Sequence, residues 1–440
     1  RRDLLPRRAG RARRRGQPRG RTAVLIAFLI AGLASAAAAL SYAEFAGMIP
    51  RAGSAYTYGF VALGELVAWF IGWDLLLEYI AIVAVVAIGI SGYLAAFLNG
   101  FGITLPLAIT ASPEDGGVVN IPAVLICLLV TFILSLGTRT FGRFELIAVG
   151  IKILLILFII GLGIFYINTA NYNPFMPAGF GPVLTGAATV FFAVFGYDAM
   201  STAAEEAEDG KKHMPKAIVL SLVIAMTLYV AATLVLTGMQ RYTDIDPEAG
   251  FASAFSGVGL PVIASIISVF AVLSILTVML TFLLGVTRVW FSMSRDGLLP
   301  PWFAKVDRHG TPQRVTWIAG VGSALLAGVF PIREVADLTN IGILSAFIVV
   351  CVAVILFRYT RPEAPRSFRL PLMPVVPAFG VLASLFLILQ LQWQTWLRFA
   401  IWLAIGLVLY FAYGRKHSLL DPDSPLHRGQ ATPEGRGRST

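Results

Sequence analysis

One lysine of this 440-residue chain lies well inside an apolar stretch, where an ammonium group is costly and chemically useful. Lys152 occurs in FGRFELIAVGIKILLILFII, nine residues past Arg143, which places its backbone roughly 13 Å further along a helix. An ammonium group removed from water holds its proton less firmly, so Lys152 could gain and lose a proton in a working cycle. The alternative is that its long side chain reaches back to the aqueous boundary.

Two carboxylic acids lie in a second apolar stretch, GWDLLLEYIAI. Asp74 and Glu78 are four residues apart and therefore share one face of a helix. Acidic residues in such segments usually point into the protein and mark functional positions. Glu78 is the deeper of the two and is a candidate partner for Lys152. Structural pairing with tyrosine or backbone donors is the other interpretation.

A third stretch, GPVLTGAATVFFAVFGYDAMSTAAEEAEDG, combines small residues with Gly196 and, two positions later, Asp198. Glycine disfavours helix by about 1 kcal/mol relative to alanine, so a break at Gly196 is a plausible ligand site. An unwound turn frees carbonyl groups that a ligand, water or neighbouring protein must satisfy. The alternative is that Gly196 only permits close approach of another helix.

The elements that position these residues must be membrane spans. Hydrophobic residues make up 57% of the chain and charged residues 13%, which is far from the composition of a soluble domain. The net charge of +10 is concentrated in residues 1–21, which hold ten arginines and one aspartate and leave about +1 for the remainder. A nucleic-acid-binding function is therefore excluded.

The sequence carries no signature of an enzyme or of a metal site. Cys127 and Cys351 lie in apolar runs and are predicted to be core residues, and the four histidines lie in polar connections without metal-ligand spacing. No nucleophile or acid–base pair has the spacing that catalysis needs. We expect no catalytic residue, no metal and no cofactor.

Eleven apolar windows are long enough to cross a bilayer core of about 30 Å. They are Ala23–Ala46, Leu66–Leu98, Val118–Leu136, Phe144–Ile167, Val183–Ala204, Ala217–Met239, Leu260–Met293, Val315–Phe330, Val335–Phe357, Val375–Leu391 and Trp396–Tyr413. Residues 23–413 are thus predicted to form one transmembrane domain.

The loops alternate in basic content, and cytoplasmic loops hold the excess of Lys and Arg. EEAEDGKKHMPK and RYTRPEAPRSFR are basic-rich, whereas NTANYNPFMPAGFG has no basic residue. This pattern predicts a cytoplasmic C-terminus, with residues 414–440 as a polar, disordered tail.

An odd number of spans that ends in the cytoplasm begins outside, which would put the arginine-rich leader, residues 1–22, on the extracellular face. That placement contradicts the same charge rule. We therefore expect a twelfth span before Ala23 and interpret the leader as a shifted reading frame or mis-called start. A genuine basic leader or targeting extension, and an assembly artefact, are the alternatives.

Several stretches resemble the amino acid–polyamine–organocation superfamily, specifically bacterial relatives of the cationic amino acid transporters. They are AVLIAFLIAGLASAAAALSYAEFAGMIPRAGSAYTYGFVALGELVAWFIGWDLLLEY, GAATVFFAVFGYDAMSTAAEEAEDGKKHMPKAI, LGVTRVWFSMSRDGLLPPWFAKV and LTNIGILSAFIVVCVAVILFRYTRP. The resemblance implies an all-α polytopic membrane protein with an inverted-repeat (5+5 helix) transporter fold plus two C-terminal helices. Eleven of the twelve spans are recognisable, and the Gly-rich first helix has no match in residues 1–22.

The resemblance also implies which residues bind substrate. The fifth window matches the discontinuous sixth helix of the family, whose unwound carbonyls take the ammonium group of an amino acid. The matching positions are Phe192, Ala193, Val194, Phe195 and Gly196, with Tyr197, Met200, Met279 and Thr281 near the side-chain pocket. None of these is acidic, which favours neutral or mixed substrates over strictly cationic ones.

Proton coupling follows from the resemblance as well. Lys152 matches a lysine that occupies the place of sodium in sodium-coupled relatives, and Glu78 matches an acidic position in the third helix. We therefore expect a secondary active amino acid transporter of the cell membrane, driven by the proton gradient and working by alternating access. An amino acid or polyamine exchanger is one alternative, and a non-transporting remnant or sensor is another. The expected partners are an amino acid and the lipid bilayer; the oligomeric state stays open.

Overall fold

The computed structural model describes residues 24–49, 53–137, 141–173, 179–202, 209–241, 244–246, 248–306 and 312–419. Every regular element in these ranges is a helix. The arginine-rich leader and most of the predicted tail lie outside the described residues, so the expectations about them stay predictions.

The first half of the chain contains α1 (Val24–Met48), α2 (Ala55–Leu63), α3 (Glu65–Asn99), α4 (Leu107–Thr110), α5 (Ile121–Ser135), α6 (Phe141–Gly163), α7 (Gly181–Val190) and α8 (Tyr197–Thr202). The second half contains α9 (Gly210–Met239), α10 (Gly250–Gly257), α11 (Pro261–Arg295), α12 (Gln313–Val329), α13 (Ile332–Thr360), α14 (Val375–Leu389), α15 (Trp393–Leu409) and α16 (Arg415–His417). Short 3-10 turns lie at Pro113–Asp115, Ile164–Tyr166, Thr169–Tyr172 and Phe191–Ala193, and a π-helical turn at Tyr410–Gly414 follows α15.

Ten of the eleven predicted windows each coincide with one helix over most of their described residues, and the fifth is divided between α7 and α8. Eight segments among the described residues are long and apolar enough to cross a membrane. The windows at α5, α12 and α14 form shorter helices of 15, 17 and 15 residues. The chain is therefore a multi-pass membrane protein.

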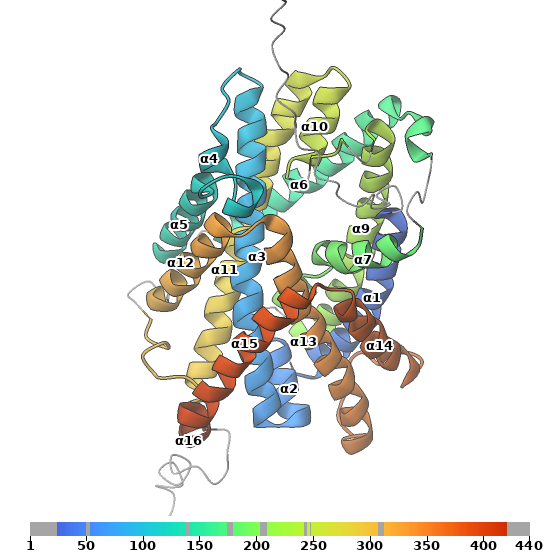
Figure 1. Cartoon of the computed structure of the whole chain (residues 1–440). Helices are drawn as coiled ribbons and strands as arrows, with labels where there is room; N and C mark the ends of the chain where they lie inside the picture. The colour runs from blue at the N-terminus through green and yellow to red at the C-terminus, as the bar shows by residue number, and fades with distance from the viewer. Residues whose placement is uncertain are drawn as a thin grey trace, which may run out of the picture.

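The 35-residue helix α3 runs through the middle of the molecule, with a length of about 52 Å at 1.5 Å per residue (Figure 1). It packs against α11 and α13 along its length and against α5 and α12 on one side. Gly64 separates it from α2 because the φ of 91° at this residue is a conformation that interrupts a helix and favours glycine.

A second group of helices, α1, α7 and α9, lies beside this central group (Figure 1). The buried face of α1 is built from small residues, including Ala27, Ala31, Ala34 and Ala38. Small side chains allow helices to approach closely where lipid supplies no hydrophobic driving force between them. The chain thus contains two packed groups of helices, with the short α8 between them and contacts to both.

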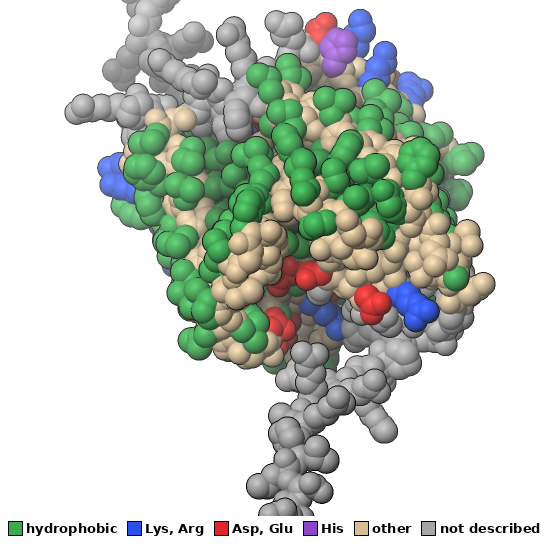
Figure 2. Space-filling model, turned by 90° about the horizontal axis from the view of Figure 1, so that it is seen from above, with side chains coloured by type: hydrophobic (Ala, Val, Ile, Leu, Met, Phe, Trp, Pro, Cys, Tyr) green, Lys and Arg blue, Asp and Glu red, His purple; other side chains and the backbone are tan. Residues whose placement is uncertain are grey.

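Apolar side chains also cover much of the outer surface. Figure 2 shows hydrophobic side chains over much of the visible face, beside other side chains and backbone, with charged ones among the described residues in only a few places. Large hydrophobic residues such as Leu146 (75% exposed) and Phe165 (83% exposed) project outward from α6 and the turn after it. This surface is suited to contact with lipid tails rather than water.

Candidate functional site

The helix expected to be discontinuous is broken in the structure. α7 ends at Val190, a 3-10 turn covers Phe191–Ala193, and α8 begins at Tyr197. Gly196 has a φ of 122°, which L side chains rarely adopt. The glycine therefore has a conformational role at the break.

Neighbouring helices satisfy part of the freed backbone. Ser35 of α1 donates to the carbonyl of Val194 at 2.8 Å, and Tyr197 donates to the carbonyl of Ser35 at 3.0 Å. On the other side, the amide nitrogen of Asn340 in α13 donates to the carbonyls of Ala188 at 2.8 Å and Thr189 at 3.3 Å, which ties down the end of α7. In this conformation the Val194 carbonyl already has a protein partner.

A cluster of three carboxylic acids lies next to the break. Asp198, in the first turn of α8, accepts a hydrogen bond of 2.9 Å from Tyr79 of α3. The side chains of Asp74 and Glu78 are fully buried, and no donor among the described residues reaches either carboxyl oxygen of these two acids. The charge of Glu78 interacts with those of both Asp198 and Asp74.

The backbone of α13 closes this acidic cluster on one side. A Cβ atom added to Gly342 would lie 2.8 Å from Oδ1 of Asp74, so α13 passes directly over that carboxyl group. Buried carboxyl groups without donors are costly unless they are protonated or bind a positively charged group. The cluster is therefore suited to hold a proton or a cationic ligand group.

Aromatic rings line the other side of the break. The ring centroids of Phe192 and Phe195 are 5.6 Å apart, and Phe282 of α11 lies 5.8 Å from Phe195 and 5.5 Å from Tyr79. Met279 lies one helical turn before Phe282, and its side chain is fully buried on the same side of α11. Five of the predicted substrate positions, Phe192–Gly196, thus lie where the helical hydrogen bonding of the backbone is interrupted.

The remaining predicted substrate positions do not gather at the break. Tyr197 is buried against Tyr42 and Phe347, with ring centroids 5.5 and 5.3 Å away, and Met200 lies one turn further along α8. Thr281 lies on a different side of α11 from Met279, because two residues correspond to about 200° around a helix. Thr281 bonds to α6 instead of facing the break.

The structure does not pair Lys152 with Glu78. The Lys152 ammonium group donates to the hydroxyl of Thr277 in α11 at 3.4 Å, and Glu145, on the same helix as Lys152, is the carboxylate whose charge acts on it. Glu78 interacts with Asp74 and Asp198 instead. The hypothesis of a Glu78–Lys152 pair was wrong because spacing along the chain gives depth but not the direction in which a helix face points.

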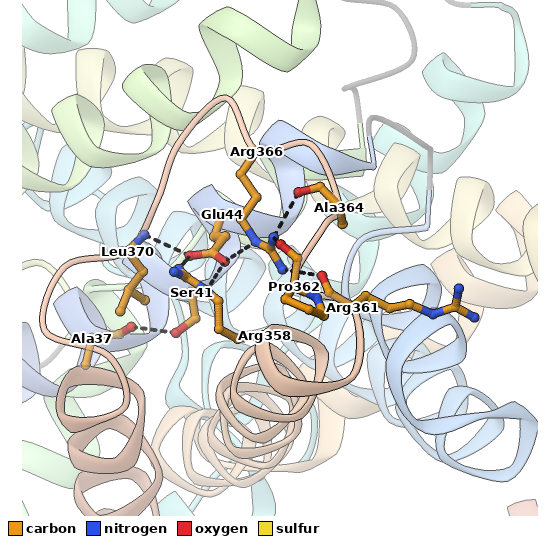
Figure 3. A network of polar contacts seen from close by, with 9 residues as sticks. All are labelled: Ala37, Ser41, Glu44, Arg358, Arg361, Pro362, Ala364, Arg366 and Leu370. Carbon is orange, nitrogen blue, oxygen red and sulfur yellow. Dashed lines mark hydrogen bonds and ion pairs between the residues drawn. The ribbon is translucent and has the colours of Figure 1, made fainter.

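A second polar cluster ties the C-terminal end of α1 to α13 (Figure 3). Both oxygens of the buried Glu44 accept hydrogen bonds from Arg358, and Oε1 also accepts one from Arg366 at 3.1 Å. The backbone N–H of Leu370 donates to Oε2 at 2.8 Å. The side chain of Arg366, which is 2% exposed, donates in turn to the carbonyls of residues 361, 362 and 364.

Comparisons with known proteins agree with this arrangement. A family model for amino acid permeases matches residues 18–411. The chain is 47% identical over 406 residues to the branched-chain amino acid permease BcaP of Bacillus subtilis, covering 90% of this chain and 86% of that protein. It is 46% identical over 402 residues to the methylthioribose transporter of the same bacterium, covering 91% and 87%.

A more distant relative is the vacuolar cationic amino acid transporter 4 of Arabidopsis thaliana, 33% identical over 350 residues, with 78% of this chain and 58% of that protein covered. The fold defines a multi-pass membrane protein, and the matching family and relatives are permeases, which makes this chain a transporter rather than an enzyme. The chain belongs to the amino acid permease family, within the amino acid–polyamine–organocation superfamily.

Several residues of the site, among them Tyr79, Asn340 and Glu145, were not singled out from the sequence. Tyr79 and Asn340 bond to the two ends of the broken helix, and Glu145 bonds to Thr281. A periodicity signal existed for Glu145 alone, because it precedes Lys152 by seven residues and therefore shares its helix face. For the other two residues the partner lies more than 100 positions away in the chain.

Proposed function

We propose that the chain imports amino acids together with protons by alternating access at the cell membrane, with its C-terminus in the cytoplasm. The α-amino group of the substrate would bind to backbone carbonyls of residues 192–196. Lys152 would take up and release the proton between α6 and α11.

The observation that carries the proposal is the break between α7 and α8 at Gly196. A helix interrupted within a membrane span offers carbonyl groups and a helix N-terminus to a ligand, which uninterrupted helices do not. The aromatic rings of Phe192, Phe195 and Phe282 supply an apolar surface beside those backbone groups. An apolar substrate side chain would fit against these aromatic rings.

The proposal is tested by uptake of labelled leucine into liposomes containing the purified full chain. With the outside one pH unit more acidic, leucine should accumulate several-fold above the level without a gradient, and a protonophore should abolish this. Exchange of leucine for preloaded unlabelled leucine should persist in Lys152→Ala, whereas pH-driven accumulation should not. Accumulation that depends only on preloaded amino acid would favour the exchanger.

Cationic amino acids are a second candidate class of substrate. Asp74, Glu78 and Asp198 form a buried acidic cluster next to the break, two of them without a donor among the described residues. A side-chain ammonium or guanidinium group would satisfy these carboxylates. The relatives include permeases for branched-chain and for cationic amino acids, so similarity alone does not choose between the classes.

Competition experiments separate the two classes. If the acidic cluster binds the substrate's side chain, unlabelled lysine or arginine should compete with labelled substrate better than leucine does. Glu78→Gln should then weaken that competition at least tenfold and leave leucine nearly unchanged. If leucine remains the better competitor in both proteins, the substrate is neutral and the cluster has another role.

A further inference from the structure

Two side chains of opposite charge lie on the same face of α6, where this helix contacts α11. Glu145 and Lys152 are seven residues apart, which is almost two full helical turns, so both project from the same face of α6. Each meets a threonine of α11: Thr281 donates to Oε1 of Glu145 at 2.8 Å, and Lys152 donates to Thr277 at 3.4 Å. The two threonines are themselves one turn apart.

The positions of Glu145 and Lys152 across the membrane determine which of the two lies nearer the cytoplasm. α6 begins near Glu145 and α11 ends beyond Thr281. The adjoining segments, residues 139–143 and 295–314, are rich in Lys and Arg, which predicts that both helix ends face the cytoplasm. Lys152 is therefore the deeper group. Glu145 lies about 10 Å closer to the cytoplasmic end, measured along the helix axis at 1.5 Å per residue.

We propose that Glu145 is the acceptor that receives the proton from Lys152 and passes it to the cytoplasm, with Thr281 positioning its carboxylate. This assignment rests on the proposed proton-coupled function. No other residue of the site described above has both a carboxylate and a hydrogen bond along the α6–α11 contact. The carboxylates of Asp74, Glu78 and Asp198 lie beside the broken helix and interact with each other.

The transfer balances without another reactant. An N–H bond of the Lys152 ammonium group breaks and an O–H bond forms on Glu145, which converts two partly buried charged side chains into a neutral amine and a neutral carboxylic acid. Glu145 then loses this proton to cytoplasmic water. Separating the two charges in an apolar seam would be costly, so moving the proton between them is the cheaper way to discharge Lys152.

Other titratable groups also lie on the helices packed against α6. On α11, Arg288 lies seven residues beyond Thr281, hence on the same face and nearer the end of the helix. On α9, Lys211, Lys212, His213 and Lys216 lie in the first two turns, and Tyr229 packs against Phe28 of α1. The carboxylate whose charge acts on Lys152 is that of Glu145.

The test compares two transport modes of the full chain in liposomes for the unchanged protein, Glu145→Gln and Glu145→Asp. Leucine counterflow needs no net proton transfer, because Lys152 can stay protonated throughout. Counterflow by Glu145→Gln should stay within about twofold of that of the unchanged protein. Its pH-driven uptake should be at least tenfold lower. Glu145→Asp, which retains a carboxylate, should recover a measurable part of the driven uptake.

Three results would overturn the assignment. Unchanged pH-driven uptake in Glu145→Gln would show that no acceptor is needed at this position. An equal loss of both modes in Glu145→Gln, without recovery in Glu145→Asp, would show a purely structural role. If the unchanged protein performs counterflow but no pH-driven uptake, proton coupling itself fails, and that result is distinguishable from the first two because it involves no variant.

Discussion

The phenol of Tyr79 in α3 donates a hydrogen bond of 2.9 Å to Asp198, joining the central helix to the first turn after the break in the α7–α8 span. Both side chains are buried, and the Tyr79 ring lies directly against Gly285 of α11. Three helices therefore meet at the point where the broken helix resumes.

Removal of this hydroxyl should destabilise the protein. Tyr79→Phe leaves Oδ2 of Asp198 without its donor while it preserves the ring, which predicts a loss of about 1–3 kcal/mol. Thermal unfolding of the purified protein in detergent measures the effect. Tyr172→Phe is the matched control, because the Tyr172 hydroxyl donates to the carbonyl of Leu234 at an exposed position. Equal shifts in the two variants would contradict the role assigned to Tyr79.

The backbone at Gly196 leads to a second prediction. Gly196→Ala places a Cβ on a residue with a φ of 122°, which should cost roughly 1–3 kcal/mol or force the break to rearrange. We expect a lower unfolding temperature and at least tenfold slower leucine uptake. Gly89→Ala, within α3 and with open space around the added Cβ, should be neutral or slightly stabilising. Normal uptake by Gly196→Ala would argue against a special backbone at the site.

The Glu44 cluster predicts a strong effect of neutralisation. Glu44→Gln leaves Arg358 and the 2%-exposed Arg366 without their carboxylate, and breaking a buried ion pair in this way costs about 3–5 kcal/mol. Glu334→Gln removes the partner of Arg398, where the side chains are 22% and 34% exposed, so it should cost less than about 1 kcal/mol. Unfolding in detergent compares the two. If Glu44→Gln destabilised the protein no more than Glu334→Gln does, the buried ion pairs of Glu44 would be contradicted.

A pH dependence is expected from Glu248, in the segment between α9 and α10. Burial against Gly92 of α3, followed by the negative charges of Asp246 and Asp115, raises the pKa of Glu248 to about 7 from an ordinary value of 4.5. Because the folded pKa is the higher one, this carboxyl stabilises the fold most when protonated. Its contribution is complete below about pH 4.5 and is lost as the pH rises through about 7.

Glu248→Gln stays uncharged and should flatten the dependence of the unfolding temperature on pH between about 5 and 8. The expected difference is at most about 3 kcal/mol across that range. Glu114→Gln, at an exposed position, serves as the control and should follow the unchanged protein. An unaltered pH profile in Glu248→Gln would exclude Glu248 as its source.

Hydropathy and spacing along the chain predicted most of the fold. Ten of the eleven apolar windows each form one helix, and Gly196 marks the break in the fifth, because both features depend on local composition that the sequence displays directly. The separate helices α2 and α10 were not predicted. They are 9 and 8 residues long and lie between or beside longer apolar segments.

Side-chain partners across helices were predicted poorly. Glu44 is buried and paired with Arg358 and Arg366, which lie more than 300 residues away in the chain, and nothing in the sequence pattern pointed to these partners. Lys152 and Glu78 are both deep in spans but face different helices. Contacts of this kind depend on the rotation of each helix about its axis, which the apolar pattern of a span buried on several sides does not specify.

The central claim is that substrate and proton move together, and proton entry measures this most directly. A pH-sensitive dye inside liposomes that contain the full chain reports acidification when leucine is added outside at equal pH on both sides. The account predicts acidification of the interior with the unchanged protein and none with Lys152→Ala, although that variant still exchanges leucine. Leucine entry into the same liposomes without any acidification would contradict it.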